Sequence, residues 1–255
     1  MSEELLVTNI TGEPFQPVRI YYKVTNKKTI LGVFKKLKCV EYDPARKCWV
    51  WFYKAEAEKI KFEISYNKIP KEKHPIIIGY FIFKTDREML LELRSFERVI
   101  KALNFFTKRI NWRVAEPTRL RIVNKLFTTP PHTQLSIPNY DDFFERDDVC
   151  IRNAELLEKE LMEIENQHDD PEKRSAAIDT YFKEKSKLPL PETEELSINI
   201  HGGGIEVLNL ALKMKHIETL ERWNGNENFV MQDLIERMLE HIPEDELKKQ
   251  ESKDS

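Results

Sequence analysis

The sequence predicts an α+β protein, with a mostly antiparallel sheet and a packed helix in the N-terminal half, followed by a helix-rich C-terminal half. Two observations support this class. Short β-branched and aromatic segments dominate the first half, whereas segments with apolar residues at helical spacing dominate the second. The formal net charge of −3 also divides unevenly, because residues 1–130 sum to +12 and residues 131–255 sum to −15. This change in charge coincides with the change from strands to helices, which indicates two modules.

The strands of the first half are predicted from runs of β-branched and aromatic residues. About fifteen loose residues come first, and then VRIYYKV (residues 18–24) predicts a strand. Residues 29–37 fit either a helix capped by Thr29 or a bent strand. A turn at Asp43-Pro44 predicts a hairpin of strands 39–42 and 47–53. The remaining strands are expected at residues 60–66, 75–83, 89–94 and 119–127.

Helices are predicted from capping residues and apolar stripes. Ser95 is a typical N-cap for a helix over residues 96–108, which carries an apolar stripe from Phe96 to Phe106. Asp170-Pro171 starts a later helix, because Asp favours the cap and Pro favours the first turn. Further helices are expected over residues 150–166, 204–223 and 229–242, with a short strand at 196–200.

The domain organisation follows from these segments. Residues 1–127 are expected to form a basic α+β domain, and residues 141–242 an acidic helical module. Between them, residues 128–140 hold three prolines and few apolar anchors, which predicts an extended connector. The polar residues 243–255 are predicted to be a disordered tail.

Composition narrows the class of protein further. The chain has no run of about 18 apolar residues and a mean hydropathy of −0.56, so no membrane-spanning helix is predicted. The acidic start, residues 1–4, predicts neither a secretory signal nor a transit peptide. Cys39, Cys48 and Cys150 match no zinc spacing, so reduced thiols in a cytoplasmic protein are expected. No metal site is predicted, because the acidic residues within 141–148 lack EF-hand spacing. No cofactor is predicted either, because the glycine loop at 201–204 matches neither GxxxxGK[ST] nor GxGxxG.

Aromatic and basic residues of the first half form a candidate nucleic-acid site. The aromatic residues alternate on one face of a predicted strand, where their rings could stack on single-stranded bases, and the arginines could contact phosphates. The candidates are Trp49, Trp51, Tyr53, Arg113, Arg119 and Arg121. The opposite face of the aromatic strand is apolar too, which is typical of a strand buried on both sides. Core packing is therefore the favoured interpretation of the three aromatic residues.

Two further candidate sites lie in the second half. The loop His201-Gly202-Gly203-Gly204 precedes a helix whose N-terminus could bind an anion, with a tight lead-in to the helix as the structural alternative. The same loop resembles an esterase oxyanion loop, but no GxSxG motif accompanies it, and no catalytic residue is assigned. Trp223, Phe229 and Met231 are candidate anchors for a protein partner, with packing inside the module as the alternative.

Four stretches of the first half resemble a family of uncharacterised proteins conserved among cyanobacteria. They are RIYYKV (19–24), KCWVWFYKAEAEKIKF (47–62), LRSFERVIKALNFF (93–106) and RIVNKLF (121–127). The resemblance implies a bacterial cytoplasmic protein and carries no activity with it.

These observations favour a non-enzymatic binding or adaptor protein that acts through protein contacts. The alternative is an RNA- or single-strand-DNA-binding protein that uses the basic first half, and a third possibility is an enzyme with a site assembled from scattered residues. The charge division raises one structural question. The basic half meets either an external polyanion or the acidic half of its own chain.

Overall fold

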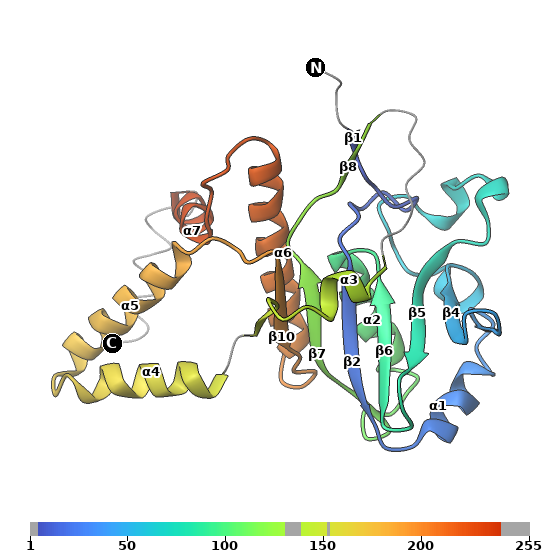
Figure 1. Ribbon diagram of the computed structural model, residues 1–255, viewed down its shortest axis with the longest axis horizontal. Coiled ribbons are helices and arrows are strands. Elements are labelled where there is room, and N and C mark those ends of the chain that lie inside the picture. The colour runs from blue at the N-terminus through green and yellow to red at the C-terminus, as the bar shows by residue number, and fades with distance from the viewer. Residues whose placement is uncertain (1–4, 131–138, 152–153, 241–255) are drawn as a thin grey trace. The chain divides into compact units, whose positions relative to one another are not determined.

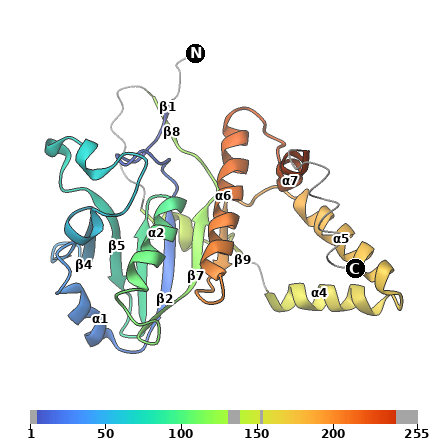
Figure 2. The same cartoon turned by 180° about the vertical axis from the view of Figure 1, so that it is seen from behind.

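The computed structural model describes residues 5–130, 139–151 and 154–240 (Figures 1 and 2). The chain forms two compact units, Met1–Arg152 with Pro191–Lys213 and Asn153–Leu190 with Met214–Ser255. The predicted boundary at residues 128–140, of which 131–138 lie outside the described residues, does not coincide with this division. The physical reason is strand pairing, since β10 (Thr193–Ser197) lies in the acidic half but pairs along its whole length with β7 (Ala115–Val123).

The first unit is built on an eight-stranded sheet with the strand order β3-β4-β5-β6-β2-β7-β10-β9. All neighbouring strands are antiparallel except β10 and β9, so the mostly antiparallel α+β fold is confirmed. The remaining strands are β2 (Val18–Val24), β3 (Val40–Asp43), β4 (Cys48–Phe52), β5 (Ile77–Phe83), β6 (Glu88–Leu93) and β9 (Cys150–Ile151). A separate ribbon pairs β1 (Leu5–Leu6) with β8 (Thr128–Thr129), inside the predicted connector.

One face of the sheet carries the hydrophobic core. Helix α2 (Phe96–Phe106) lies against this face, behind the sheet in Figure 1 and in front of it in Figure 2. Alternate residues of β2, from Val18 to Val24, enter the core, as the period of a strand requires. Helix α1 (Lys27–Phe34) adds the fully buried Ile30 and Phe34 to the same cluster.

Local sequence signals gave the correct element type at several positions. Residues 29–34 lie in helix α1 rather than in a bent strand, residues 35–37 follow it as a turn, and Asn26, not Thr29, caps α1. The hydroxyl of Ser95 accepts a hydrogen bond from the N–H of Arg98, as expected of an N-cap. Residues 60–66 form no strand, although Phe62 is buried in the core and Ile60 and Tyr66 pack against it.

The second face of the sheet carries a short helix, α3 (Asp141–Phe144), which is the one helix that the described residues of the first unit place on this side (Figure 1). Phe144 is fully buried against Val123 of β7. The hydroxyl of Tyr140 donates a hydrogen bond of 2.7 Å to the carbonyl of Leu93 on β6. These contacts hold α3 against this face of the sheet. The side chains of the strands form the rest of the surface on this face.

The second unit consists of helices, as the sequence predicts. They are α4 (Ala154–Asn166), α5 (Pro171–Ser186), α7 (Met231–Glu240) and the part of α6 (Gly204–Trp223) that begins at Met214. Asp170 caps α5, since its side chain accepts from the N–H of Glu172. No helix among the described residues is long and apolar enough to cross a bilayer. The predicted tail, 243–255, lies outside the described residues.

Gly79 of β5 is a position where the neighbouring strand leaves no room for a side chain. A Cβ at this position would lie 2.7 Å from Cδ2 of Leu93 and 2.8 Å from the carbonyl oxygen of Glu92. We expect Gly79→Ala to lower the free energy of unfolding by about 1–3 kcal/mol through overpacking, measured by urea denaturation. Gly32→Ala is the matched control, because apart from its chain neighbours and the backbone of α1 nothing lies within 4 Å of that Cβ. Equal effects of the two substitutions would contradict the close approach.

Candidate functional site

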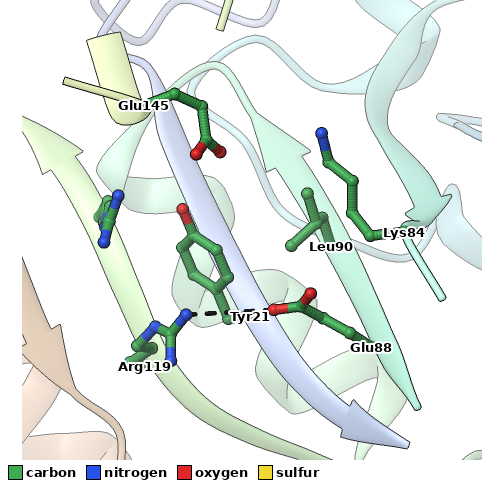
Figure 3. Close-up of a pocket in the computed structure, with 7 residues that line it drawn as sticks. Tyr21, Lys84, Glu88, Leu90, Arg119 and Glu145 are labelled. Atoms are coloured by element: carbon green, nitrogen blue, oxygen red, sulfur yellow. Dashed lines mark ion pairs between the residues drawn. The ribbon is translucent and has the colours of Figure 1, made fainter. Parts of the chain in front are cut away.

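A pocket of about 250 Å³ opens on the second face of the sheet in the first unit. Its walls are mostly charged, and its floor combines a tyrosine with a leucine. The lining residues are Tyr21, Lys84, Glu88, Leu90, Arg119, Arg121 and Glu145 (Figure 3). They come from three adjacent strands, from the turn before β6 and from the residue that follows α3.

Strand register places these side chains together. Tyr21 of β2 pairs with Leu90 of β6 on one side and with Arg119 of β7 on the other. Two residues away, Arg19 pairs with Glu92 and Arg121 in the same way. Because residues at positions i and i+2 of a strand share a face, the whole group points away from the core.

Arg19 is the centre of the charge network behind the pocket. Its side chain is 1% exposed, and its guanidinium lies 2.6 Å from Glu92, 2.5 Å from Asp141 and 2.8 Å from Glu145. Burial raises the pKa of Glu92, and Arg19 partly opposes this shift. The hydrogen bond from Arg19 lowers the pKa of Asp141. Carboxylates from the acidic half of the chain therefore neutralise an arginine of the basic half, within one compact unit.

Arg121 and Arg119 form the wall on the β7 side. Arg121 Nε donates 2.8 Å to Glu195 of β10, and its Nη1 donates to the carbonyl of Phe144. Arg119 is held more loosely, because Nη2 lies 4.0 Å from Glu88 and Nε lies 3.3 Å from Glu195 without forming a hydrogen bond. Arg119 is 41% exposed and Arg121 is 17% exposed. Arg119 is thus the arginine that a ligand can reach.

Tyr21 lies at the floor between these two arginines. The guanidinium carbon of Arg119 lies 4.3 Å from the ring centroid, and that of Arg121 lies 5.5 Å from it. The hydroxyl is buried, donates no hydrogen bond and points towards the side of the pocket that Glu145 occupies (Figure 3). Burial raises the pKa of Tyr21, and the charges of Arg121 and Arg19, together with a hydrogen bond from Arg19, oppose that shift. A buried O–H donor without an acceptor costs about 1–3 kcal/mol, which a ligand could recover.

The chemistry of this pocket suits binding. Three donors of the lining are unused, namely the hydroxyl of Tyr21, the guanidinium of Arg119 and the ammonium of Lys84, which lies 4.0 Å from the carboxylate of Asp141. The carboxylate of Glu88, 4.0 Å from Arg119, is the loosely held acceptor beside them. Within the described part of the chain, no three His, Cys, Asp or Glu side chains converge as metal ligands.

The aromatic residues predicted to stack on bases lie elsewhere. Trp51 is fully buried and Tyr53 is 1% exposed, so both belong to the core and neither can stack on a base. Trp49 is partly buried against Phe34. The prediction of an exposed aromatic platform is therefore wrong for Trp51 and Tyr53, because their strand is buried on both faces, as the favoured alternative held.

The three predicted arginines are divided. Arg119 and Arg121 line the pocket on the second face of the sheet, whereas the aromatic cluster around Trp51 packs on the core face. Arg113 precedes β7, is exposed and lies over the ring of Trp112. It does not line the pocket.

The glycine loop is a tight lead-in to α6. The N–H of Gly204 donates to the carbonyl of His201, and the N–H groups of Glu206 and Val207 donate to the carbonyl of Gly203. Gly202 and Gly203 have positive φ values of 53° and 79°, which glycine adopts without strain. No cation lies in the loop. The structural alternative thus accounts for residues 201–204.

The candidate partner anchors differ in exposure. Trp223 at the end of α6 is 42% exposed, and Met231 at the start of α7 is half-buried. Phe229 is buried, and the guanidinium of Arg237 covers its ring at 4.7 Å. The assignment of Phe229 as an anchor is therefore wrong, since the second unit uses this ring for its own packing.

Comparisons with protein-family models, with curated proteins and with solved structures gave no match to this chain. The resemblance of its first half to a cyanobacterial family stays a prediction.

Sequence reasoning missed Tyr21, Lys84, Glu88 and Glu145 as members of a site. One signal for the strand residues was present. Both RIYYKV and RLRIV alternate polar and apolar residues, which places Arg19 with Tyr21 and Arg119 with Arg121 on the non-core face. The pairing of these two strands, and the position of Glu145 over them, follow only from the fold.

Proposed function

We propose that the protein is a non-enzymatic binding protein that recognises a protein partner through the second face of its sheet. The observation that carries the proposal is the pocket around Tyr21. Some hydrogen-bond donors in this pocket have no acceptor, while most charged side chains around it are paired with opposite charges. The proposal places the protein in the cytoplasm, in keeping with its free thiols at Cys39, Cys48 and Cys150.

The charge balance favours a protein over a nucleic acid as the partner. Four cations take part in the network, and five carboxylates surround them: Arg19, Lys84, Arg119 and Arg121 against Glu88, Glu92, Asp141, Glu145 and Glu195. A polyanion needs a surplus of free positive charge, because phosphate neutralisation supplies most of its affinity. Protein surfaces present charges of both signs beside apolar and aromatic groups, and this face matches that mixture.

The proposal is tested by selection of displayed peptides. Random peptides on phage are selected against the immobilised full chain, and the selected peptides are titrated in solution against wild type, Arg119→Glu and Lys36→Glu. Arg119 lies in the pocket, whereas Lys36 is an exposed residue after α1 and serves as the charge-reversal control. We expect Arg119→Glu to weaken binding at least tenfold and Lys36→Glu to leave it unchanged.

Two results would overturn the proposal. In one, the selected peptides bind Arg119→Glu and wild type equally. In the other, a short single-stranded RNA binds the wild type at ~50 mM salt and loses affinity in Arg119→Glu, which would identify the same face as a nucleic-acid site.

A further inference from the structure

We infer that the pocket around Tyr21 binds the carboxylate of an acidic side chain, a glutamate or aspartate, on the protein partner. This inference rests on the proposed function and names the group that the pocket recognises. It follows from the unused hydrogen-bonding groups of the pocket, from the charges that line it and from the way in which this face already holds carboxylates of its own chain.

The unused groups lie on and around the ring of Tyr21. The hydroxyl of Tyr21 is more than nine-tenths buried and donates no hydrogen bond. The guanidinium of Arg119 lies over the same ring at 4.3 Å, towards the end opposite the hydroxyl in Figure 3. It is 41% exposed, and its nearest carboxylate contacts lack hydrogen bonds. A carboxylate has two oxygens, so one can accept from the hydroxyl and the other from the planar guanidinium.

The charges of the lining select an anion over a cation. Lys84, Arg119 and Arg121 outnumber Glu88 and Glu145 in the lining. Arg19 already holds Glu145, and Glu195 already holds Arg121, each at 2.8 Å, so the loosely paired cations are Lys84 and Arg119. A cationic side chain would have to enter beside these two like charges. A singly charged carboxylate competes only with Glu88, whose pairing with Arg119 is loose at 4.0 Å. The lining has one positive charge in excess, which one carboxylate balances, whereas a phosphate with a charge of about −1.5 to −2 would exceed it.

The same face shows how it holds carboxylates. Arg19 binds Glu92 from the neighbouring strand together with Asp141 and Glu145 from the segment of α3. Arg121 binds Glu195 with Nε at 2.8 Å. Arg119 lies two residues before Arg121 on the same strand and is the arginine of this row whose hydrogen-bond donors are unused. A carboxylate of the partner would pair with Arg119 as the carboxylate of Glu195 pairs with Arg121.

The inference is tested with N-acetyl-glutamate N′-methylamide, which offers one carboxylate on a neutral backbone. The probe is titrated into the full chain, and binding is followed by NMR at the Nε–H of Arg119 and the ring of Tyr21. We expect a saturable shift at both groups. The glutamine and lysine analogues are the matched controls, and neither should give a saturable shift.

Three variants assign the binding to this pocket. Tyr21→Phe keeps the ring and removes the hydroxyl, and Arg119→Gln removes the charge. Each should weaken the probe roughly tenfold, which is the effect of losing one hydrogen bond to a charged group. Arg46→Gln is the control, because Arg46 is another exposed arginine over a tyrosine, 5.5 Å from the ring of Tyr80, and lies outside the pocket. The Arg46→Gln variant should bind the probe with the affinity of the wild type.

The outcomes separate the two proposals. Equal binding of the glutamine analogue, tighter binding of the lysine analogue, or wild-type affinity in both Tyr21→Phe and Arg119→Gln would overturn the carboxylate inference. The proposed function would survive that result if the selected peptides still depended on Arg119. Conversely, probe binding without any peptide that depends on Arg119 would overturn the protein-binding proposal on which the inference rests.

Discussion

Replacing Arg98 by methionine is expected to lower the free energy of unfolding by about 3–5 kcal/mol, the usual cost of removing one partner from a buried ion pair. Arg98 lies in the first turn of α2 and is 1% exposed. Its Nε donates 2.6 Å to Glu13, a carboxylate that is itself 4% exposed. Without the guanidinium, that carboxylate would remain buried with no opposite charge.

The other nitrogens of Arg98 hold two separate parts of the fold together. Nη1 donates to the carbonyls of Ile77 and Ile78 at the start of β5, at 3.0 and 2.9 Å, and Nη2 donates 2.8 Å to the hydroxyl of Thr11. Lysine cannot replace this planar set of donors, so Arg98→Lys should recover only part of the loss. The substitution therefore tests a junction of helix, strand and N-terminal segment.

Urea denaturation of the full chain, followed by circular dichroism, measures the effect. Arg87→Met is the matched control, because Arg87 is exposed in the turn before β6 and should change the free energy of unfolding by less than about 0.5 kcal/mol. The double variant Arg98→Met/Glu13→Gln should recover part of the stability, since no unpaired charge is then buried. A loss below about 1 kcal/mol in Arg98→Met would show that the junction contributes little.

This junction also shows where sequence reasoning stops. Ser95 could be identified as an N-cap, because the signal lies within the first turn of the helix. The first fifteen residues were expected to be loose, yet Thr11 and Glu13 are buried and bonded to Arg98. Their partner lies more than eighty residues further along the chain, and no local pattern encodes such a pairing.

The same distinction applies to the charge division of the chain. The sequence shows that the second half is acidic and the first half basic, but it does not show which residues meet. In the structure, Glu195 reaches Arg121 because β10 joins the sheet, and Asp141 and Glu145 reach Arg19 because Phe144 anchors α3. Contact between the basic half and the acidic half was one of the predicted outcomes. The pairing of β10 with β7, which brings Glu195 to Arg121, was not predicted.

Replacing Arg19 by methionine is expected to lower the free energy of unfolding at neutral pH by about 3 kcal/mol. Glu92, with a side chain that is 12% exposed, would lose the cation that lies 2.6 Å from it, and this loss accounts for most of the cost. Asp141 and Glu145 are 46% and 53% exposed, so water can solvate them once the arginine is gone.

The pH dependence of this loss has a definite sign. In the wild type, Arg19 lowers the pKa of Asp141, so the stability from this pair is present above the ordinary Asp pKa of about 4 and is lost as the pH falls through the lowered value. Burial raises the pKa of Glu92, and the loss of Arg19 should raise it further. Protonation of Glu92 then removes the unpaired charge. The stability difference between wild type and Arg19→Met should therefore shrink from about pH 7 to about pH 4.

Urea denaturation between pH 7 and pH 4 tests the prediction. The chemical shift of the Glu92 carboxyl carbon follows the protonation of that residue over the same range. Adding Glu92→Gln to Arg19→Met should restore part of the stability at pH 7 and remove most of the pH dependence, because the stranded carboxylate is gone. A difference that stays constant with pH would mean that Arg19 acts by packing against Phe144, whose ring centroid lies 5.4 Å from its guanidinium, rather than by charge. The response of Glu92 thus decides whether the carboxylates of this face are held by charge, which is the property that the pocket beside them is proposed to use.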